Sequence, residues 1–293
     1  MIRVPRAGVT IIELMVALAV MAGLAAILIP AVQSARGTSR RLACSARLKE
    51  IGVASHALHS AIGRFPATGE AYRELHEAMG FPLDSSGNLP GFAPGFQCPA
   101  DSWATGGGVS KNYVLNAGTM TRFADHVRNG YAPLLRERVA TEISDGLSTT
   151  AAFSERLVIR YSSSAADVWA GPERHLWWTE PVPDETRAND PIALQRCVER
   201  RTSQLPLRLW LIDSSGRGYD HRITPNRPGC WVGAFPDAQP DDPLVPASSE
   251  HHGGVNVLFA DGHVAFIADQ IDVAVWRALG TINGGEPVEG NME

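Results

Sequence analysis

Side chains of metal-ligand type gather around one short segment in the last third of the chain. His251 and His252 precede the apolar run VNVLFA, and Asp261 and His263 follow it. Imidazole and carboxylate groups bind zinc, whereas carboxylates and loop carbonyls bind calcium. We expect these side chains to lie at the same end of neighbouring strands. Because Asp261 also suits a tight turn, we assign these four residues a structural role and expect no bound metal. Calcium is the alternative cofactor.

The same segment predicts a β-hairpin. Residues 255–260 and 263–267 are two β-rich runs, and Asp261 and Gly262 stand between them. An Asp-Gly pair in this position favours a two-residue type I′ turn. Apolar side chains on both faces of the first run indicate a buried strand. A short helix is expected to follow, capped by Asp269 or Asp272.

The chain has four cysteines and no CxxC pair, which argues against a zinc ribbon or a redox motif. Disulfides are permitted if the domain lies outside the cytoplasm. We expect Cys44 to pair with Cys98 and Cys197 with Cys230, because each bond would tie neighbouring segments together. Free buried thiols are the alternative.

Other features bound the class of function. Ser154 stands beside Glu155 without the Gly-x-Ser-x-Gly context of a hydrolase nucleophile, so we expect no enzymatic activity. The net charge of −5 gives nucleic-acid binding no general electrostatic support. The 28 glycines and 20 prolines favour short strands and many turns over a helical bundle.

The amino-terminal segment predicts a membrane-spanning helix. Residues 9–29 are largely apolar and carry one charge, Glu13, and two arginines precede Gly8. A helix of this length spans roughly 31 Å, the thickness of the hydrocarbon core of a bilayer. A carboxylate within such a helix is costly, so Glu13 requires an explanation.

The sequence around Gly8 resembles the signal of type IV pilins and type II secretion pseudopilins, in which a basic leader precedes Gly8 and the run VTIIEL. The resemblance implies that a prepilin peptidase cuts between Gly8 and Val9 and methylates the new amino terminus. Val9 differs from the usual phenylalanine of that family. The resemblance also implies that Glu13 pairs with the free amino group of a neighbouring subunit and sets the register of assembly. A plain membrane anchor and an ordinary signal peptide are the alternatives.

A second resemblance covers most of the chain. His251 is followed by nine residues and then by Asp261 and Gly262. This spacing resembles the His-x9-Asp-Gly motif of large prepilin-type proteins. Three further strings are similar to that family: CSARLKEIG at 44–52, CPAD at 98–101 and SDGLSTTAAFSE at 144–155.

The two resemblances imply partners and a location. The partners are the prepilin peptidase, other pilin or pseudopilin subunits through the amino-terminal helix, and inner-membrane assembly machinery. The location is the inner membrane, crossed once, with a cytoplasmic amino terminus and a periplasmic or filament-borne domain. Basic residues after the span, such as Arg40 and Arg41, would favour the opposite orientation if charge alone decided.

The expected fold is α+β, with a long pilin-like helix packed on a β-rich, loop-rich domain. The leader comprises residues 1–8, the membrane-spanning part 9–29, and the amphipathic second half of the helix 30–63, with a kink at Pro30. The domain comprises residues 64–293. The expected function is that of a pilin-like or pseudopilin subunit. The alternative is a membrane-tethered binding module that does not polymerise.

Overall fold

The computed structural model defines two compact units, Met1–Leu42 and Ala43–Glu293. The residues that the structure describes are 10–66, 70–90, 93–103, 111–119, 121–122, 127–132, 138–158, 176–179, 218–232 and 242–286.

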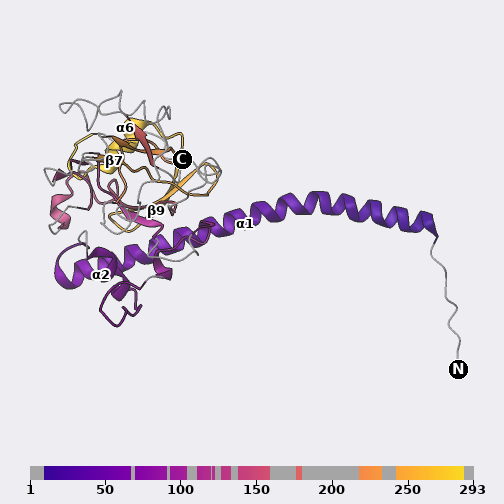
Figure 1. The fold of residues 1–293 in the computed structure, drawn as a ribbon, viewed down its shortest axis with the longest axis horizontal. Coiled ribbons are helices and arrows are strands. Elements are labelled where there is room, and N and C mark those ends of the chain that lie inside the picture. Colours follow the sequence, from indigo (N-terminus) through magenta and orange to yellow (C-terminus); the bar gives the residue numbers. More distant parts are fainter. Residues whose placement is uncertain are drawn as a thin grey trace. The chain divides into compact units, whose positions relative to one another are not determined.

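Helix α1, Ile11–Ile62, runs without interruption through the first unit and into the second (Figure 1). The long amino-terminal helix predicted from the sequence is thereby confirmed. Pro30 lies inside the helix, which continues through it. In the described part of the chain, α1 is the one helix long and apolar enough to cross a membrane.

In the second unit, the later part of α1 buries one stripe of side chains. Cys44, Leu48, Ile51 and Ala54 recur every three or four residues and are almost wholly buried. Ile62, the last residue of the helix, is 51% exposed. The stripe therefore ends before the helix does.

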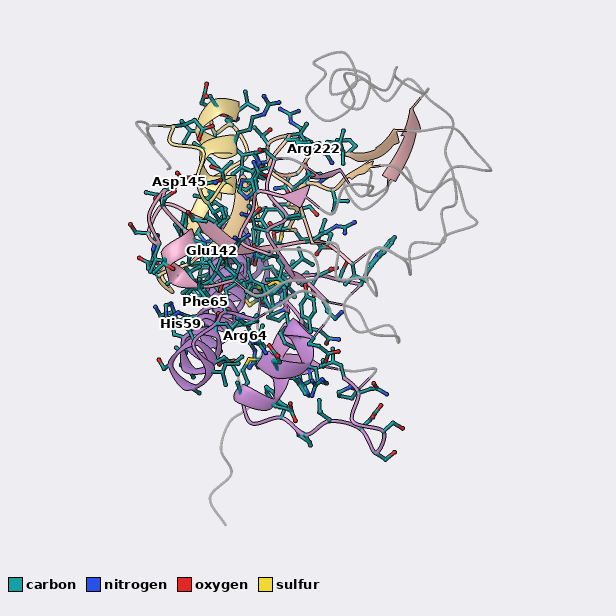
Figure 2. The ribbon with its side chains drawn as sticks, turned by 90° about the vertical axis from the view of Figure 1, so that its left-hand side faces the viewer. His59, Arg64, Phe65, Glu142, Asp145 and Arg222 are labelled. Carbon is teal, nitrogen blue, oxygen red and sulfur yellow. A yellow bond between two sulfur atoms is a disulfide. The ribbon has the colours of Figure 1, made fainter. Side chains whose placement is uncertain are left out.

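The carboxyl end of α1 is held by aromatic contacts. Gly63 follows the helix with a φ of +76°, a conformation that favours glycine. Phe65 is buried, and its N–H donates to the carbonyl of Arg138 (2.8 Å). The ring of His59 stacks on the ring of Phe65, with 4.4 Å between their centroids; Figure 2 labels both residues. This pair fixes the point at which the chain leaves the helix.

A four-stranded antiparallel sheet forms the centre of the second unit. Its strands are β1 (Tyr113–Leu115), β4 (Ala151–Glu155), β8 (Gly254–Phe259) and β9 (Val264–Ala268), in the order β1-β4-β8-β9. Phe153 pairs with Leu258 across β4 and β8, so the central strand pair joins segments about a hundred residues apart. The sheet and α1 together confirm the expected α+β class.

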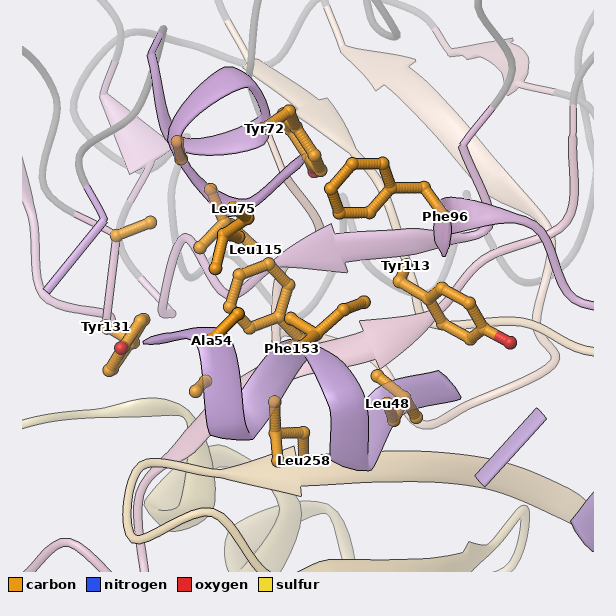
Figure 3. Packing of buried hydrophobic residues seen from close by; sticks show 14 of the residues in the cluster. Leu48, Ala54, Tyr72, Leu75, Phe96, Tyr113, Leu115, Tyr131, Phe153 and Leu258 are labelled. Atoms are coloured by element: carbon orange, nitrogen blue, oxygen red, sulfur yellow. The ribbon is translucent and has the colours of Figure 1, made fainter. Parts of the chain in front are cut away.

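The two faces of the sheet bury different cores. On one face Leu115, Phe153 and Leu258 pack with Leu48 and Ala54 of α1, as Figure 3 shows. Alternation of side chains along a strand sends the intervening residues to the other face. There the buried side chains of β8 pack with those of helix α6 (Val273–Gly280); this second core includes Val255, Val257, Phe259, Trp276 and Leu279.

Smaller elements complete the described part of the second unit. They are α2 (Ala71–Ala78), η1 (Pro94–Phe96), η2 (Ala140–Glu142), the pair β2 (Thr121–Arg122) and β3 (Val127–Arg128), and the sheet of β5 (Leu176–Thr179), β6 (Gly229–Val232) and β7 (Asp242–Leu244). In the last sheet β5 runs parallel to β6, and β6 runs antiparallel to β7.

The hairpin of β8 and β9 differs from prediction at its turn. The N–H of Gly262 donates to the carbonyl of Phe259 (2.9 Å), and the N–H of Phe259 donates to the carbonyl of His263 (2.9 Å). Gly262 has a φ of +89°, and Asn226 is the only non-glycine residue with a positive φ in the described chain. The two-residue type I′ turn was therefore wrong. The loop has three residues, a type I turn followed by a left-handed glycine.

Helix α6 begins as predicted. The carboxylate of Asp272 accepts from the N–H groups of Ala274 (2.7 Å) and Val275 (3.3 Å). Asp272 is therefore the helix cap, and Asp269 is not. The cap places Trp276 in the core, where its Nε1 donates to the carbonyl of Ile223 (2.8 Å).

Candidate functional site

The amino-terminal part of α1 presents an apolar surface. Its large side chains from Ile11 to Val32 are each roughly half exposed or more, up to 78% at Ile11. A continuous apolar surface of this size marks an interaction with lipid or with other protein. The first unit therefore carries a helix whose side chains need a partner beyond its own fold.

Glu13 has a local role that the sequence analysis missed. The N–H and the hydroxyl of Thr10 donate to Oε2 of Glu13 (2.8 and 2.9 Å), and the N–H of Glu13 approaches Oγ1 of Thr10 (3.3 Å). This reciprocal arrangement is a capping box, which satisfies N–H groups at the start of a helix. The signal was the spacing Thr-x-x-Glu ahead of an apolar run. Gly8 and Val9 lie outside the described residues.

The two halves of the His-x9-Asp-Gly motif lie at opposite ends of β8. His251 precedes the strand, whereas Asp261 and His263 lie at the hairpin turn beyond its other end. Five residue steps along an antiparallel strand span about 17 Å. The expectation that these side chains lie at the same end of neighbouring strands was therefore wrong, because the strand runs between them.

At the turn, Asp261 holds His263. The carboxylate Oδ1 accepts from the N–H of His263 (3.0 Å) and lies 2.6 Å from its Nδ1. Partial burial opposes ionisation, but the hydrogen bonds from the backbone and ring of His263 leave the pKa of Asp261 below its usual value. The ring of His263 stacks on Phe259 at 4.3 Å. These contacts stabilise the loop.

At the other end of β8, His251 meets a buried carboxylate. Its Nε2 lies 3.2 Å from Oε1 of Glu155, the last residue of β4. Glu155 is 1% exposed. Its Oε2 accepts from the N–H of Asn256 (2.7 Å), and its Oε1 accepts from Nδ2 of Asn256 (2.9 Å). A buried carboxylate requires such donors, and β8 supplies them next to β4.

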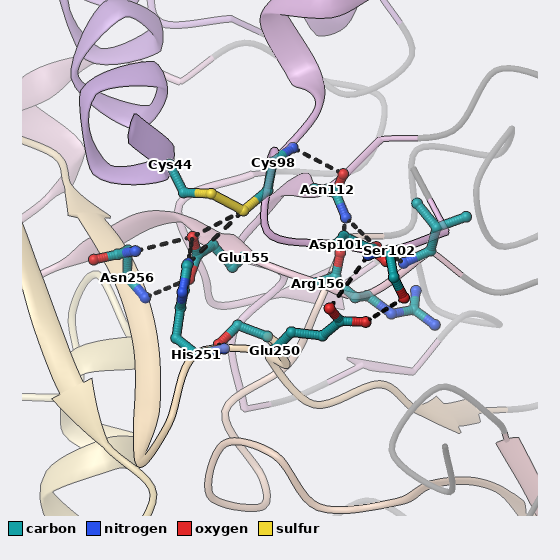
Figure 4. The surroundings of a disulfide bond; sticks show 12 residues. Cys44, Cys98, Asp101, Ser102, Asn112, Glu155, Arg156, Glu250, His251 and Asn256 are labelled. Atoms are coloured by element: carbon teal, nitrogen blue, oxygen red, sulfur yellow. Dashed lines mark hydrogen bonds and ion pairs between the residues drawn. A yellow bond between two sulfur atoms is a disulfide. The ribbon is translucent and has the colours of Figure 1, made fainter. Parts of the chain in front are cut away.

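A disulfide joins Cys44 of α1 to Cys98, with Cα atoms 5.0 Å apart. This is one of the two pairings expected from the sequence. Sγ of Cys98 lies 3.8 Å from Oε1 of Glu155 and 3.8 Å from Nε2 of His251 (Figure 4). The two sulfurs, the carboxylate and the imidazole thus form one buried cluster, which we call the Cys44–His251 cluster. Cys197 and the side chain of Cys230 lie outside the described residues.

Asn112 and Asp101 support this cluster from the side of Cys98. The N–H of Cys98 donates to Oδ1 of Asn112 (2.9 Å), and Nδ2 of Asn112 donates to Oδ2 of Asp101 (2.6 Å). The same Oδ2 accepts from the N–H of Val158 (2.8 Å), just beyond β4. The loop that carries Cys98 is thereby fixed to the strand that carries Glu155.

The hydroxyl of Ser154 makes a structural contact. Ser154 is fully buried, and its hydroxyl donates to the carbonyl of Asn256 (3.2 Å). The hydroxyl therefore serves the pairing of β4 with β8.

The four strings that carry the second resemblance converge on the Cys44–His251 cluster. Cys44 begins the first string, Cys98 the second, Glu155 ends the third, and His251 begins the motif. A family model described as "Protein of unknown function (DUF1559)" matches residues 33–80 and 70–274. The chain belongs to this family.

The DUF1559 match includes every residue of the cluster and begins after the apolar part of α1. No curated protein matches the chain, and no solved structure matches it. The family match therefore covers most of the second unit and the last residues of the first, while Gly8, Val9 and Glu13 precede the matched residues.

Proposed function

We propose that this DUF1559 protein is a prepilin-type subunit that is cleaved after Gly8 and assembled through α1 into a type IV pilus-like or type II secretion-like structure. The observation that carries the proposal is the apolar, exposed surface of α1 from Ile11 to Val32, which continues as one helix into a folded domain. Such a helix buries its surface first in lipid and then against copies of itself.

Glu13 fits this role in a specific way. Its capping box with Thr10 satisfies one oxygen at the start of the helix. The other oxygen can accept a hydrogen bond from the amino group that cleavage creates at Val9 of a neighbouring subunit. A paired carboxylate is less costly in an apolar filament core than a lone one. We infer that this contact sets the register between subunits.

The location follows from the same proposal. The leader lies in the cytoplasm, α1 crosses the inner membrane, and the second unit lies outside. The Cys44–Cys98 disulfide supports an oxidising compartment for that unit. The proposed partners are the prepilin peptidase, other subunits and the inner-membrane assembly machinery, and the role is structural rather than enzymatic.

Intact mass of the membrane-extracted chain tests the proposal in cells that contain a prepilin peptidase. We expect the mass to lack residues 1–8 and to include one methyl group at Val9. Gly8→Leu is expected to leave the chain uncut. Gly23→Leu is the matched control, because Gly23 lies in α1 with open space around it and should be processed normally. A full-length, unmethylated wild-type chain would rule out the leader assignment.

One observation favours a second candidate, a membrane-tethered binding module. A groove of about 550 Å³ runs beside α1 in the second unit, and Val53, Ala57, Met79 and Phe81 are among its lining residues. A photo-crosslinking amino acid at Val16 separates the two candidates in membranes. An assembling subunit should crosslink to other copies through this position, whereas a tethered module should not.

A further inference from the structure

We propose that the Cys44–His251 cluster is a binding site for Zn²⁺ when its disulfide is reduced. The ligands would be the thiolates of Cys44 and Cys98, the imidazole of His251 and the carboxylate of Glu155. Their ligand atoms lie within 4.8 Å of one another, and all four residues are buried. Thiolate, imidazole and carboxylate groups in a set of four are the donors of tetrahedral zinc sites.

The distances already match three edges of such a tetrahedron. Bond lengths of ~2.3 Å to sulfur and ~2.1 Å to nitrogen or oxygen place sulfur ~3.6 Å from nitrogen or oxygen, and nitrogen ~3.4 Å from oxygen. Sγ of Cys98 lies 3.8 Å from both Nε2 of His251 and Oε1 of Glu155, and those two atoms are 3.2 Å apart. The edge between the two sulfurs must open to ~3.8 Å. The two edges from Cys44 to His251 and Glu155 lie within 4.8 Å.

The contact between Glu155 and Cys98 is not a hydrogen bond in the disulfide form. Oε1 of Glu155 faces Sγ of Cys98, and a disulfide sulfur has no hydrogen to donate. The carboxylate is 1% exposed, and the groups that reach its Oε1 are Nδ2 of Asn256 and Nε2 of His251. In the reduced chain, a cation between Cys98 and Glu155 would attract both the thiolate of Cys98 and the carboxylate of Glu155.

Neighbouring side chains are placed to orient the ligands. Asn256 donates twice to Glu155, and Asn112 accepts from the N–H of Cys98. Such outer contacts hold metal ligands in position and strengthen binding. His251 is held by its own N–H, which donates to Oγ of Ser249 (3.1 Å). Neighbouring residues therefore hold the buried ligand groups in position.

A phosphine can reduce the disulfide between Cys44 and Cys98. The phosphine attacks one sulfur, the sulfur–sulfur bond breaks, and hydrolysis gives the phosphine oxide and two thiols. Zn²⁺ then displaces the two thiol protons, and His251 binds through Nε2 with its remaining proton on Nδ1. Because Cys44 lies on α1, both the disulfide and the zinc site would fix α1 to the loop of Cys98. The disulfide would do so in an oxidising compartment, and the zinc site would do so in a reducing one.

The test is Co²⁺ titration of the full chain in detergent micelles, with Co²⁺ as a spectroscopic substitute for Zn²⁺. The background carries Cys197→Ser and Cys230→Ser, so that Cys44 and Cys98 are the only thiols. After reduction with a phosphine we expect one Co²⁺ per chain, with thiolate charge-transfer bands and the intense visible bands of tetrahedral cobalt. Zn²⁺ should displace the Co²⁺, and the oxidised chain should show neither band.

Two neighbouring histidines provide a matched pair of variants. His251→Gln retains a donor to Glu155 and should weaken Co²⁺ binding at least tenfold. His252→Gln should change nothing, because His252 is exposed and outside the cluster. The proposal is overturned if the reduced chain gives no thiolate band with Co²⁺, or if His251→Gln binds Co²⁺ as tightly as the background. It is also overturned if circular dichroism shows that reduction unfolds the chain and that Zn²⁺ does not restore the folded spectrum.

Discussion

The imidazole of His251 donates toward the carboxylate of Glu155 across 3.2 Å, although the two residues are 96 positions apart. This contact ties the loop before β8 to the end of β4. The Asp-Gly half of the motif instead holds the turn after β8. The spacing of the motif is therefore the length of one strand with a stabilising contact at each end.

The contact at the first end predicts a large difference between adjacent histidines. His251→Ala removes a hydrogen bond to a buried carboxylate and should lower the free energy of unfolding by about 2 kcal/mol. His252→Ala should change it by less than about 0.5 kcal/mol, because His252 is exposed. Urea unfolding of the disulfide-bonded chain, followed by tryptophan fluorescence, measures both. Equal losses would show that the buried pair contributes nothing.

Adjacent glycines at the start of β8 should also respond differently. A Cβ at Gly254 would collide with the carbonyl oxygen of Ile267 on β9, so Gly254→Ala should destabilise the fold by about 3 kcal/mol. Gly253 has a φ of +84° and open space around it. Gly253→Asn should therefore cost less than about 1 kcal/mol, since asparagine tolerates this conformation. The same urea experiment decides, and a larger loss at Gly253 would contradict the register of β8 with β9.

Local signals in the sequence were sufficient for the helices. The apolar run and the amphipathic segment after it predicted α1. An aspartate ahead of an apolar period predicted a cap of α6 at Asp269 or Asp272, and the structure has it at Asp272. Both depend on residues within a few turns of one another, so the pattern contains the answer.

The partner of His251 could not be predicted in this way. Glu155 reaches it only because β4 pairs with β8, and pairing between distant strands leaves no periodic mark on either segment. The turn was missed for a related reason. An Asp-Gly pair suits both a two-residue and a three-residue loop, and the register of Leu258 with Val264 selects the longer one.

The capping box at the start of α1 allows the charge of Glu13 to be separated from its helical role. Glu13→Gln retains the capping interaction, because glutamine also serves in a capping box. Under the proposed function this variant should insert into the membrane, yet its self-crosslinking through Val16 should fall about tenfold. Thr10→Val is the converse control, which removes the cap and keeps the carboxylate. Normal crosslinking by Glu13→Gln would assign Glu13 to capping alone.

A buried histidine beneath α6 predicts how stability depends on pH. Nδ1 of His221 lies 2.7 Å from the carbonyl of Trp276, which can only accept, so Nδ1 carries the proton. Nε2 then accepts from the hydroxyl of Tyr219 (2.9 Å). Burial lowers the pKa of His221 to about 4, against an ordinary value of 6.5, although the carbonyl of Trp276 and nearby Asp220 oppose the shift.

The sign of the effect follows from which state binds the proton. Between pH 6.5 and about 4 the unfolded chain protonates this histidine and the folded chain does not. The contribution of His221 is therefore complete above pH 6.5 and is lost as the pH falls toward 4, by up to about 3 kcal/mol. His221→Gln should show a shallower loss of stability over this window than the wild type, whereas the exposed variant His252→Gln should follow the wild type. Parallel pH profiles for the wild type and His221→Gln would contradict a neutral, buried His221.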